Sequence, residues 1–391
     1  MADEKSKTIS EPASDGLAGK VLVTGGAGFI GSHVVEALRD QGADVRVVDN
    51  LDPQAHGAGA DFPSYLEGVD IVRGDVKDPE LWRRALADVS HVVHFAAAVG
   101  LAQSMYEITY YTETNVMGTA HLLQALSTRA FPVSKLLVAS SMSLYGEGLY
   151  RCGNCGFEGT PRRDVADLEA ARWEMYCPRC GAALTPIPTP ETKPLQPSFV
   201  YSINKRDQEE LCLSVGRAYG IPTVALRFFS VYGPRQALSN PYTGVAAIFA
   251  SRLMGGAPPM IFEDGRQTRD FIHVRDVASA CIKSLTLDVG DVALNIGTGV
   301  PVTIADVASI LQKLLGGPDA EILETYRHGD IRHCYPDISA ARAVLGWEPT
   351  ISFEQGAEDL VEWVATQSGH AERLDQALDE LRRRGLVKDR T

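Results

Sequence analysis

A tyrosine and a lysine four positions apart form the first pair able to do acid–base chemistry. Tyr201 and Lys205 enclose Ser-Ile-Asn, and helical spacing places both side chains on one face. A lysine cation beside a phenol lowers its pKa, so the tyrosine can take a proton near neutral pH. Ser140, Ser141 and Ser143 stand in a hydroxyl-rich run after an apolar one, which places hydroxyls at the edge of a sheet where ligands bind. Tyr201 and Lys205 are predicted to be catalytic, and the alternative for the hydroxyl run is a serine-rich loop that only turns the chain.

Glycines near the start of the chain predict a dinucleotide site. Gly25, Gly28 and Gly31 follow a short apolar run and open a helical pattern. Such glycines let the backbone approach a pyrophosphate, which the helix N-terminus then binds. Asp49, at the end of the next apolar run, would accept hydrogen bonds from a ribose and repel a 2′-phosphate. The expected cofactor is therefore NAD; the alternative is a structural turn that no longer binds a cofactor.

Two Cys-x-x-Cys pairs predict a metal site. Cys152 and Cys155 form one pair and Cys177 and Cys180 the other. Four thiolates at this spacing suit a tetrahedral structural zinc and leave no open position for catalysis. A redox dithiol and a nucleic-acid-binding zinc ribbon are the alternatives, although residues 151–180 carry no excess of basic side chains.

The elements that must position these residues alternate between strand and helix. Apolar runs at 21–24, 45–49, 70–72, 91–95, 135–139 and 223–227 are separated by helical patterns around 29–39, 78–87, 106–129 and 203–219. This alternation predicts an α/β fold with a Rossmann-type, doubly wound parallel sheet. After residue 229 it weakens, which predicts a smaller α/β substrate-binding region.

Composition narrows the functional class. With 37 basic and 50 acidic residues the formal charge is −13, which argues against nucleic acid as a partner. No apolar run is long enough to cross a membrane. The first residues resemble neither a secretory signal nor a transit peptide, so a cytoplasmic enzyme is expected.

The motifs together resemble the extended short-chain dehydrogenase/reductase family, and within it the nucleotide-sugar epimerases and dehydratases. The resemblance runs from about residue 20 to about residue 364 and implies tightly bound NAD, a nucleotide-sugar substrate and a homodimer formed by the two long helices. The cofactor-binding residues that it implies, with those above, are Gly25, Gly28, Phe29, Ile30, Gly31, Asp49, Asn50, Asp75, Val76, Phe95, Ala96, Ala97, Asn115, Tyr201, Lys205 and Phe228. The substrate-binding residues are Ser143, Ser230, Asn240, Phe262, Arg269, Arg327 and Asp330, with Arg269 and Arg327 on the diphosphate.

The resemblance implies that Ser141 is the catalytic serine beside Tyr201 and Lys205, and the residues after Ser141 separate the reactions of this family. In the 4,6-dehydratases the sequence at these positions looks like Thr-Asp-Glu, and the two acids perform the elimination. This chain has Met142 and Ser143 in place of the two acids, and neither can perform an elimination. The resemblance therefore implies a 4-epimerase that oxidises carbon 4 and returns the hydride to the opposite face. A 4-ketoreductase or oxidase, a UDP-hexose 4-epimerase and a non-catalytic NAD-binding regulator are the alternatives.

The cysteine insertion points to one group within the family. Such an insertion between Ser141 and Tyr201 resembles the zinc-knuckle-containing bacterial epimerases of dTDP-6-deoxyhexoses such as dTDP-L-rhamnose. Ser230 stands at the position where the galactose epimerases of this family usually have an asparagine, which argues against UDP-galactose as the substrate. Phe262 matches an aromatic that stacks on the base in thymidine-sugar enzymes, and an ordinary core role is the alternative. We expect the insertion at the mouth of the active site, shaping or covering the sugar pocket.

The expected domains follow from these assignments. Residues 1–18 are predicted to be a disordered tail, and 19–228 a Rossmann domain that contains a zinc-ribbon-like insertion at 150–188. Residues 229–366 form the substrate-binding region, part of which returns to the sheet. Residues 367–391, with Leu374, Leu378 and Leu381 at helical spacing, form a C-terminal helical extension.

Overall fold

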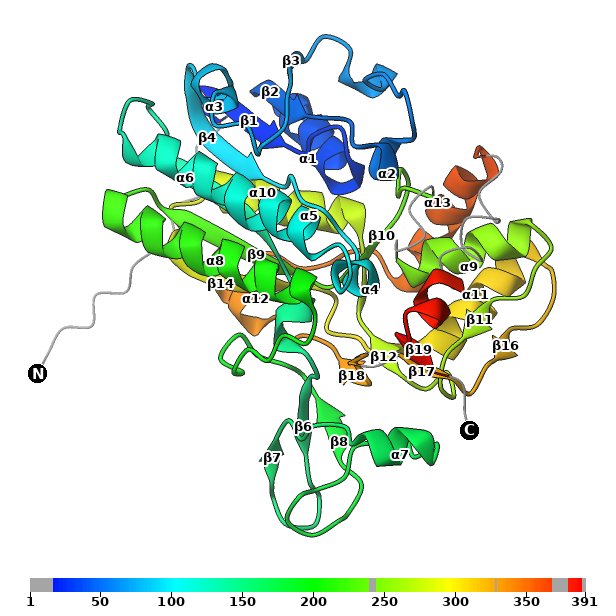
Figure 1. The fold of residues 1–391 in the computed structure, drawn as a ribbon. Helices are drawn as coiled ribbons and strands as arrows, with labels where there is room; N and C mark the ends of the chain where they lie inside the picture. The colour runs from blue at the N-terminus through cyan, green and yellow to red at the C-terminus, as the bar shows by residue number, and fades with distance from the viewer. Residues whose placement is uncertain (1–16, 239–243, 328, 368–378, 389–391) are drawn as a thin grey trace, which may run out of the picture.

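Seven parallel strands form the central sheet, in the order β14-β9-β5-β4-β1-β2-β3 (Figure 1). The computed structural model describes residues 17–238, 244–327, 329–367 and 379–388. The predicted α/β doubly wound sheet is confirmed. Its strands are β1 (Lys20–Thr24), β2 (Asp44–Asp49), β3 (Asp70–Arg73), β4 (Val89–His94), β5 (Lys135–Ser141), β9 (Thr223–Phe228) and β14 (Val292–Ile296).

Helices cover both faces of the sheet because its central strands are apolar on both sides. On one face α1 (Phe29–Asp40) packs beside α10 (Val274–Thr286), with α12 (Ser339–Leu345) at the edge. The other face is covered by α3 (Leu81–Ala85), α6 (Gly118–Ser127) and α8 (Val200–Tyr219). Because the strands are parallel, the carboxyl ends of β1, β5 and β9 lie at the same edge of the sheet, where ligands of such sheets bind.

The helix expected over 106–129 is interrupted. It consists of α5 (Ile108–Thr112), a π-helical turn (Glu113–Met117) and α6, preceded by the short α4 (Leu101–Ser104). The π turn directs Asn115 to the loop after β4, where its side chain bonds both polar backbone atoms of Ala98. Apolar periodicity does not report such a turn, which often marks a functional site.

The region that the sequence predicts to bind the substrate follows β9. It contains a second core, formed mainly by α9 (Val245–Met254), α11 (Ile304–Leu315) and α13 (Phe353–Ala365). Short strands connect these helices, and β14 returns from this region to the edge of the central sheet. The short strands are β10 (Ser230–Tyr232), β11 (Met260–Ile261), β12 (Thr268–Arg269), β13 (Phe271–His273), β15 (Val302–Thr303), β16 (Glu321–Ile322), β17 (Tyr326–Arg327), β18 (His333–Cys334) and β19 (Val387–Lys388).

The cysteine-containing insertion projects from the carboxyl end of β5 as a small separate lobe, drawn at the bottom of Figure 1. It consists of β6 (Leu149–Arg151), β7 (Glu158–Gly159), α7 (Val165–Glu169) and β8 (Thr185–Ile187). The three strands form an antiparallel sheet in the order β7-β6-β8. Among the described residues no helix is long and apolar enough to span a membrane.

Candidate active site

The turn between β1 and α1 forms the floor of a cavity of about 520 Å³. Gly25 has φ 69°, a conformation that favours glycine. A Cβ on Gly31 would lie 2.1 Å from the Gly25 carbonyl oxygen, so no side chain fits between helix and turn. This close packing leaves the N-terminus of α1 open to the cavity, where its backbone donors can bind an anion.

Asp49 lies at the carboxyl end of β2 in the wall of the same cavity. Its Oδ2 accepts a hydrogen bond from the Ala27 amide at 3.0 Å, and its Oδ1 accepts one from the Leu51 amide at 2.9 Å. His56 Nε2 lies 3.6 Å from Oδ1. A held carboxylate here fits the ribose hydroxyls of NAD and repels an added phosphate.

The structure brings the predicted cofactor-binding residues together, with one exception. All of them line the cavity except Asn115, whose amide bonds Ala98 at 2.8 and 3.1 Å. Asn115 holds the loop that forms the wall and does not face the cavity itself, because the π turn rotates it inward. The clearance at the glycines, the donors of α1 and the Asp49 carboxylate all fit a dinucleotide. The residues brought together are Gly25, Gly28, Phe29, Ile30, Gly31, Asp49, Asn50, Asp75, Val76, Phe95, Ala96, Ala97, Tyr201, Lys205 and Phe228.

The predicted catalytic residues meet at the end of this cavity. Ser141 is the last residue of β5, and its Oγ accepts from the Ser143 amide at 3.1 Å. Tyr201 and Lys205 lie in the first turns of α8, where both side chains are buried. Lys205 Nζ donates to the Ala139 carbonyl at 3.1 Å, and Ser104 Oγ accepts from the Tyr201 amide at 3.0 Å. The strand end and the helix start therefore hold all three side chains.

The pKa of Tyr201 differs from the sequence-based expectation. Burial raises it to about 12, and a hydrogen bond to Ser141 only partly opposes this effect. Burial also lowers the pKa of Lys205 to about 8. The expected lowering of the Tyr201 pKa by Lys205 is thus wrong, because burial disfavours the charged phenolate and the opposing effect comes from Ser141.

A second cavity of about 370 Å³ adjoins the first, and Ser141 and Tyr201 line both. Phe228 and Ser230 are also shared. A ligand in the second cavity would therefore contact Ser141 and Tyr201, which a ligand in the first cavity also reaches. The predicted substrate-binding residues in it are Ser143, Ser230, Phe262, Arg269, Arg327 and Asp330, whereas Asn240 lies outside the described residues.

Two arginines give the second cavity a cationic end. Arg327 pairs with Asp330 at 2.7 Å, and Arg269 pairs with the other oxygen of the same carboxylate at 3.3 Å. The two arginines hold the pKa of Asp330 below its usual value although burial opposes them. The Arg327 guanidinium also lies 4.7 Å from the centre of the Phe262 ring. Cations beside an aromatic ring suit a nucleoside diphosphate.

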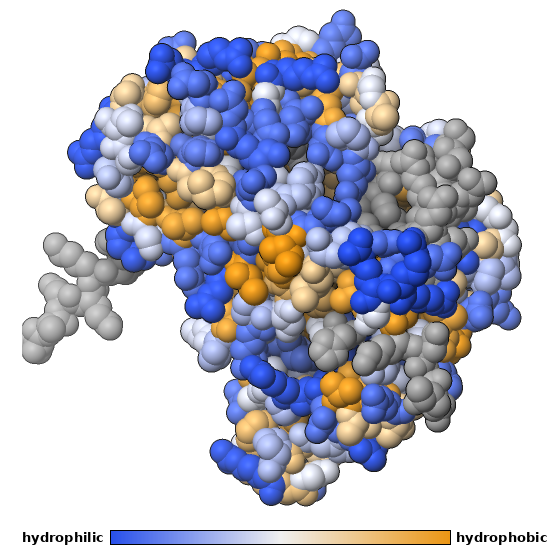
Figure 2. Space-filling view, in the orientation of Figure 1, coloured by the Kyte–Doolittle hydropathy of each residue, from blue (hydrophilic) through white to orange (hydrophobic). Residues whose placement is uncertain are grey.

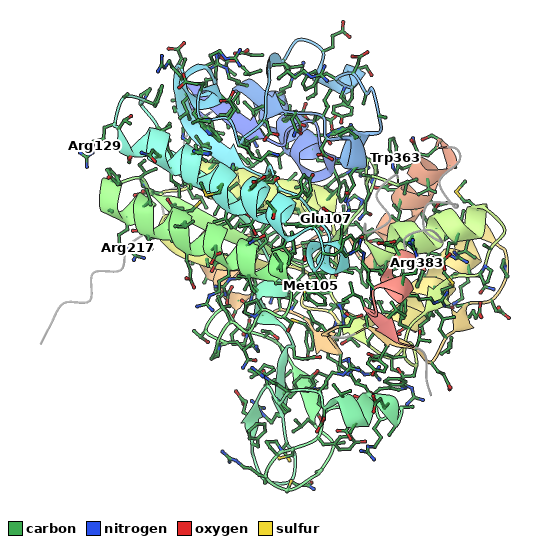
Figure 3. All side chains as sticks on the ribbon, in the orientation of Figure 1. Met105, Glu107, Arg129, Arg217, Trp363 and Arg383 are labelled. Carbon is green, nitrogen blue, oxygen red and sulfur yellow. The ribbon has the colours of Figure 1, made fainter. Side chains whose placement is uncertain are left out.

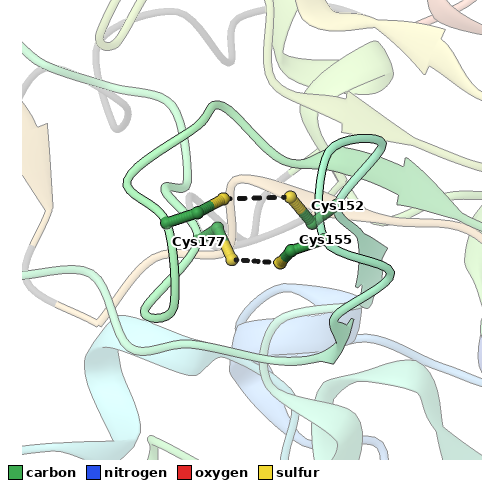
Figure 4. Close-up of side chains that lie close together, drawn as sticks. Cys152, Cys155 and Cys177 are labelled. Atoms are coloured by element: carbon green, nitrogen blue, oxygen red, sulfur yellow. Dashed lines mark hydrogen bonds between the residues drawn. The ribbon is translucent and has the colours of Figure 1, made fainter.

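The four insertion cysteines converge. Cys152 Sγ lies 3.5 Å from Cys180 Sγ, and Cys155 Sγ lies 3.5 Å from Cys177 Sγ (Figure 4). All four sulfur atoms lie within 4.8 Å of one another. Thiolates around a tetrahedral zinc are separated by about 3.8 Å, so the donor set fits that ion.

The insertion contacts the substrate-binding loops from outside. Glu174 accepts from Nε2 of His333 at 3.1 Å and also pairs with Arg332, which is fully buried. Arg163 reaches Glu263 at 2.6 Å. Among the described residues none from 150–188 lines the second cavity, so the expected covering of the sugar pocket is not seen. The insertion instead lies behind the residues that form its wall.

The Glu174 contacts predict an acid-sensitive stability. Hydrogen bonding to His333, followed by Arg332, lowers the pKa of Glu174 to about 2, from 4.5. A lowered carboxyl pKa stabilises the fold above pH 4.5, and this contribution is lost as the pH falls toward 2. We expect Glu174→Gln to flatten the stability–pH curve between these values in urea unfolding. Glu169→Gln, an exposed change on α7, should leave the curve unaltered, and an equal effect of both would contradict the assignment.

Sequence reasoning missed side chains that close both cavities. Gln54 of α2 (Pro53–His56) lines the first cavity and exchanges two amide hydrogen bonds with Gln103, at 2.8 and 2.9 Å. The Asp-Pro start of α2 could have indicated this helix, but no signal in the sequence pairs it with Gln103.

The C-terminal segment closes the second cavity. Leu381 lines it, β19 pairs antiparallel with β17, and the Arg384 guanidinium lies 4.0 Å from the centre of the Tyr106 ring. In Figure 3 Arg383 marks this segment and Met105 marks the end of α4 near it. The expected extension is therefore helical around Leu381, whereas Leu374 and Leu378 lie outside the described residues.

Known proteins are similar to this chain in sequence and in fold. A 35% identical relative, over 89% of this chain and 95% of its own, is named dTDP-L-rhamnose 4-epimerase, from Burkholderia thailandensis. The solved UDP-glucose 4-epimerase of Thermotoga maritima with UDP-glucose is 31% identical, with a TM-score of 0.71 over 89% of this chain and 99% of that one. The Thermus thermophilus UDP-glucose 4-epimerase, in complex with NAD, is 30% identical, with a TM-score of 0.71 over 89% and 100%.

The family assignment rests on sequence similarity over most of the chain. The sequence model of the NAD dependent epimerase/dehydratase family matches residues 21–165 and 176–297. Its match breaks only within the cysteine-containing insertion. The chain belongs to the NAD dependent epimerase/dehydratase family.

Proposed function

We propose that the protein is an NAD-dependent nucleotide-sugar 4-epimerase acting on a dTDP-6-deoxyhexose such as dTDP-L-rhamnose. The observation that carries this proposal is that the dinucleotide cavity and the second cavity meet at Ser141 and Tyr201. Met142 and Ser143 supply no carboxylate for an elimination. What these residues support is reversible oxidation of one sugar hydroxyl.

The chain's own residues supply the acid–base steps. Bound oxidised NAD supplies a hydride acceptor and a positive charge that favours the Tyr201 phenolate. Tyr201 takes the proton of the 4-hydroxyl and later returns it to the 4-keto oxygen, while Ser141 donates a hydrogen bond to that oxygen. Lys205 adds a second cation to the same cavity. The 4-keto sugar would turn over between these steps, so that the hydride held by the cofactor would return to the opposite face of carbon 4 and the Tyr201 proton to the oxygen on that carbon.

Two observations support a dTDP-6-deoxyhexose over a UDP-hexose. Ser230, which lines both cavities, stands at the position where galactose epimerases usually have an asparagine. The apolar side chains of Met142, Ile248 and Phe249 line the second cavity and suit a methyl group. The Burkholderia relative is named for such a substrate, whereas the two solved structures are UDP-glucose 4-epimerases, which keeps a UDP-hexose as the second candidate.

The test is turnover without added cofactor. Purified protein is analysed for bound NAD and then incubated with dTDP-L-rhamnose, dTDP-glucose, UDP-glucose or a GDP-hexose. NMR resolves the configuration at carbon 4. We expect inversion of the dTDP-6-deoxyhexose with no NADH released. Net NADH production would indicate an oxidase or reductase, and protein that binds NAD but alters no sugar would indicate a regulator; either result contradicts the proposal.

We also propose that the tetracysteine site holds a structural zinc. Metal analysis should find about one zinc per chain, because four converging thiolates form a complete tetrahedral set. Replacing both Cys152 and Cys180 by serine should remove the zinc and expose residues 150–188 to proteolysis. Cys155→Ser should do the same. Full zinc occupancy in these variants, or a zinc-free native protein with two disulfides, would contradict the assignment.

A homodimer formed through the long helices is the third proposal. Ile108, Met117 and Ile203 are 52, 47 and 45% exposed. Figure 2 shows hydrophobic side chains over α5, α6 and α8. Exposed apolar patches of this kind mark protein interfaces, and sedimentation at equilibrium gives the mass that tests it. The cytoplasmic location expected from the sequence stays a prediction.

A further inference from the structure

Arg163 belongs to the insertion, and its side chain extends between two loops of the substrate-binding region. Its Nη2 donates to Glu263 Oε1 at 2.6 Å, and its Nη1 donates to the Asp330 carbonyl at 3.3 Å. The side chain is 8% exposed and that of Glu263 is 4% exposed. One buried cation therefore joins loops that are far apart in the sequence.

Each loop held by Arg163 carries part of the second cavity. Phe262 immediately precedes Glu263, and the Arg327 guanidinium lies over its ring. Asp330 holds Arg327 and Arg269 through its two carboxylate oxygens. Two guanidinium groups repel each other, so their separation depends on where Asp330 is fixed. Arg163 itself does not line the cavity and can act only through these loops.

Other insertion residues contact the same loops. Trp173 and Leu168 pack against Tyr326, the β17 residue before Arg327, with 6.5 Å between the ring centres of Trp173 and Tyr326. Glu174 pairs with Arg332, two residues after Asp330. The insertion thus fixes the cavity wall at several points, and Arg163 is the one that contacts both loops.

We propose that Arg163 is a positioning residue, through which the insertion sets the affinity of the second cavity for the nucleoside diphosphate part of the substrate. The inference rests on the proposed function for the identity of that ligand. Without Arg163 the buried Glu263 loses one of its two cations, and the Asp330 loop loses a donor. Both loops then adopt more arrangements, and binding must order them at a cost in affinity. The chemistry at Ser141 and Tyr201 is unaffected.

The test compares neighbouring arginines. Arg163→Met should weaken the binding of dTDP and UDP to the NAD-loaded protein by about 3- to 30-fold in calorimetry. The KM for the nucleotide sugar should rise by a similar factor, with kcat and NAD content unchanged. Arg162→Met removes the same charge from the adjacent exposed position and should alter neither value. Thermal unfolding of each variant shows that it is folded.

The competing outcomes are distinct. Wild-type affinity in Arg163→Met, an equal effect of Arg162→Met, or a fall in kcat at constant KM would overturn the inference. Should Arg163→Met fail to fold, Arg163→Lys keeps a charge for Glu263 but not the second contact, and native binding by that variant would overturn it equally. If the native protein turns over no sugar, the proposed function fails, yet the dTDP and UDP affinities still decide the role of Arg163.

Discussion

Tyr201→Phe should lower kcat by about 10²- to 10⁴-fold and leave the NAD content unchanged. The substitution removes one oxygen, so the ring keeps its packing while the sugar hydroxyl loses its proton acceptor. Lys205 cannot replace it, because its ammonium donates to Ala139 and carries its own proton near neutral pH. The rate of carbon 4 inversion, followed by NMR, measures the effect.

A neighbouring tyrosine provides the matched control. The ring centre of Tyr111 lies 6.5 Å from that of Tyr201, and its hydroxyl donates to Gln103 at 2.8 Å. Tyr111→Phe loses a hydrogen bond beside the same cluster but no group that reaches the sugar. Its kcat should stay near the native value. Comparable losses in both variants would show that the effect comes from packing and that Tyr201 is not the base.

Arg332→Met should lower the free energy of unfolding by about 3–5 kcal/mol, the cost of removing one partner from a buried ion pair. Arg332 is 0% exposed and pairs with three acids. Two parallel bonds join it to Asp264, at 2.7 and 3.0 Å, and another joins it to Glu263 at 3.0 Å. Without it the buried Glu263 loses one of its two cations and lies near two further carboxylates, those of Glu174 and Asp264, which are partly solvated. Urea unfolding measures the loss.

The control for this second prediction lies on the loop of Asp264, one of the partners of Arg332. Arg266 is exposed, so Arg266→Met removes the same charge without stranding a carboxylate. It should alter the unfolding free energy by about 0.5 kcal/mol or less. A small effect of Arg332→Met would mean that the three acids take up protons or rearrange, which unfolding measured at several pH values would reveal.

The residues that could be predicted are those whose neighbours in space are also neighbours in sequence. Gly25 to Gly31 form one turn, Asp49 ends one strand, and Tyr201 and Lys205 share one helix face. Each pattern predicts its own geometry because a single element creates it. The tetracysteine cluster could be predicted for a related reason, since each Cys-x-x-Cys forms one tight turn.

The residues that could not be predicted depend on tertiary contacts. Arg163 meets Glu263, and Glu174 meets Arg332, only because the insertion folds back onto the substrate-binding loops. No local spacing encodes such a pair. Asn115 belongs to a motif that resembles a cofactor contact, yet the π turn directs its amide to Ala98. The prediction of a lowered pKa for Tyr201 was wrong for the same reason, because the burial of its side chain depends on the whole fold.

The return of β14 to the sheet constrains how the chain acquires its structure. β14 pairs with β9 in parallel, and in the sequence helices α9 and α10 lie between these two strands. During synthesis β9 therefore remains an open edge until residue 296 has emerged. An open, apolar edge strand is a site of aggregation. Fragments that end before β14 should be insoluble, and the long-range pairing should make this protein a slow folder that benefits from chaperones.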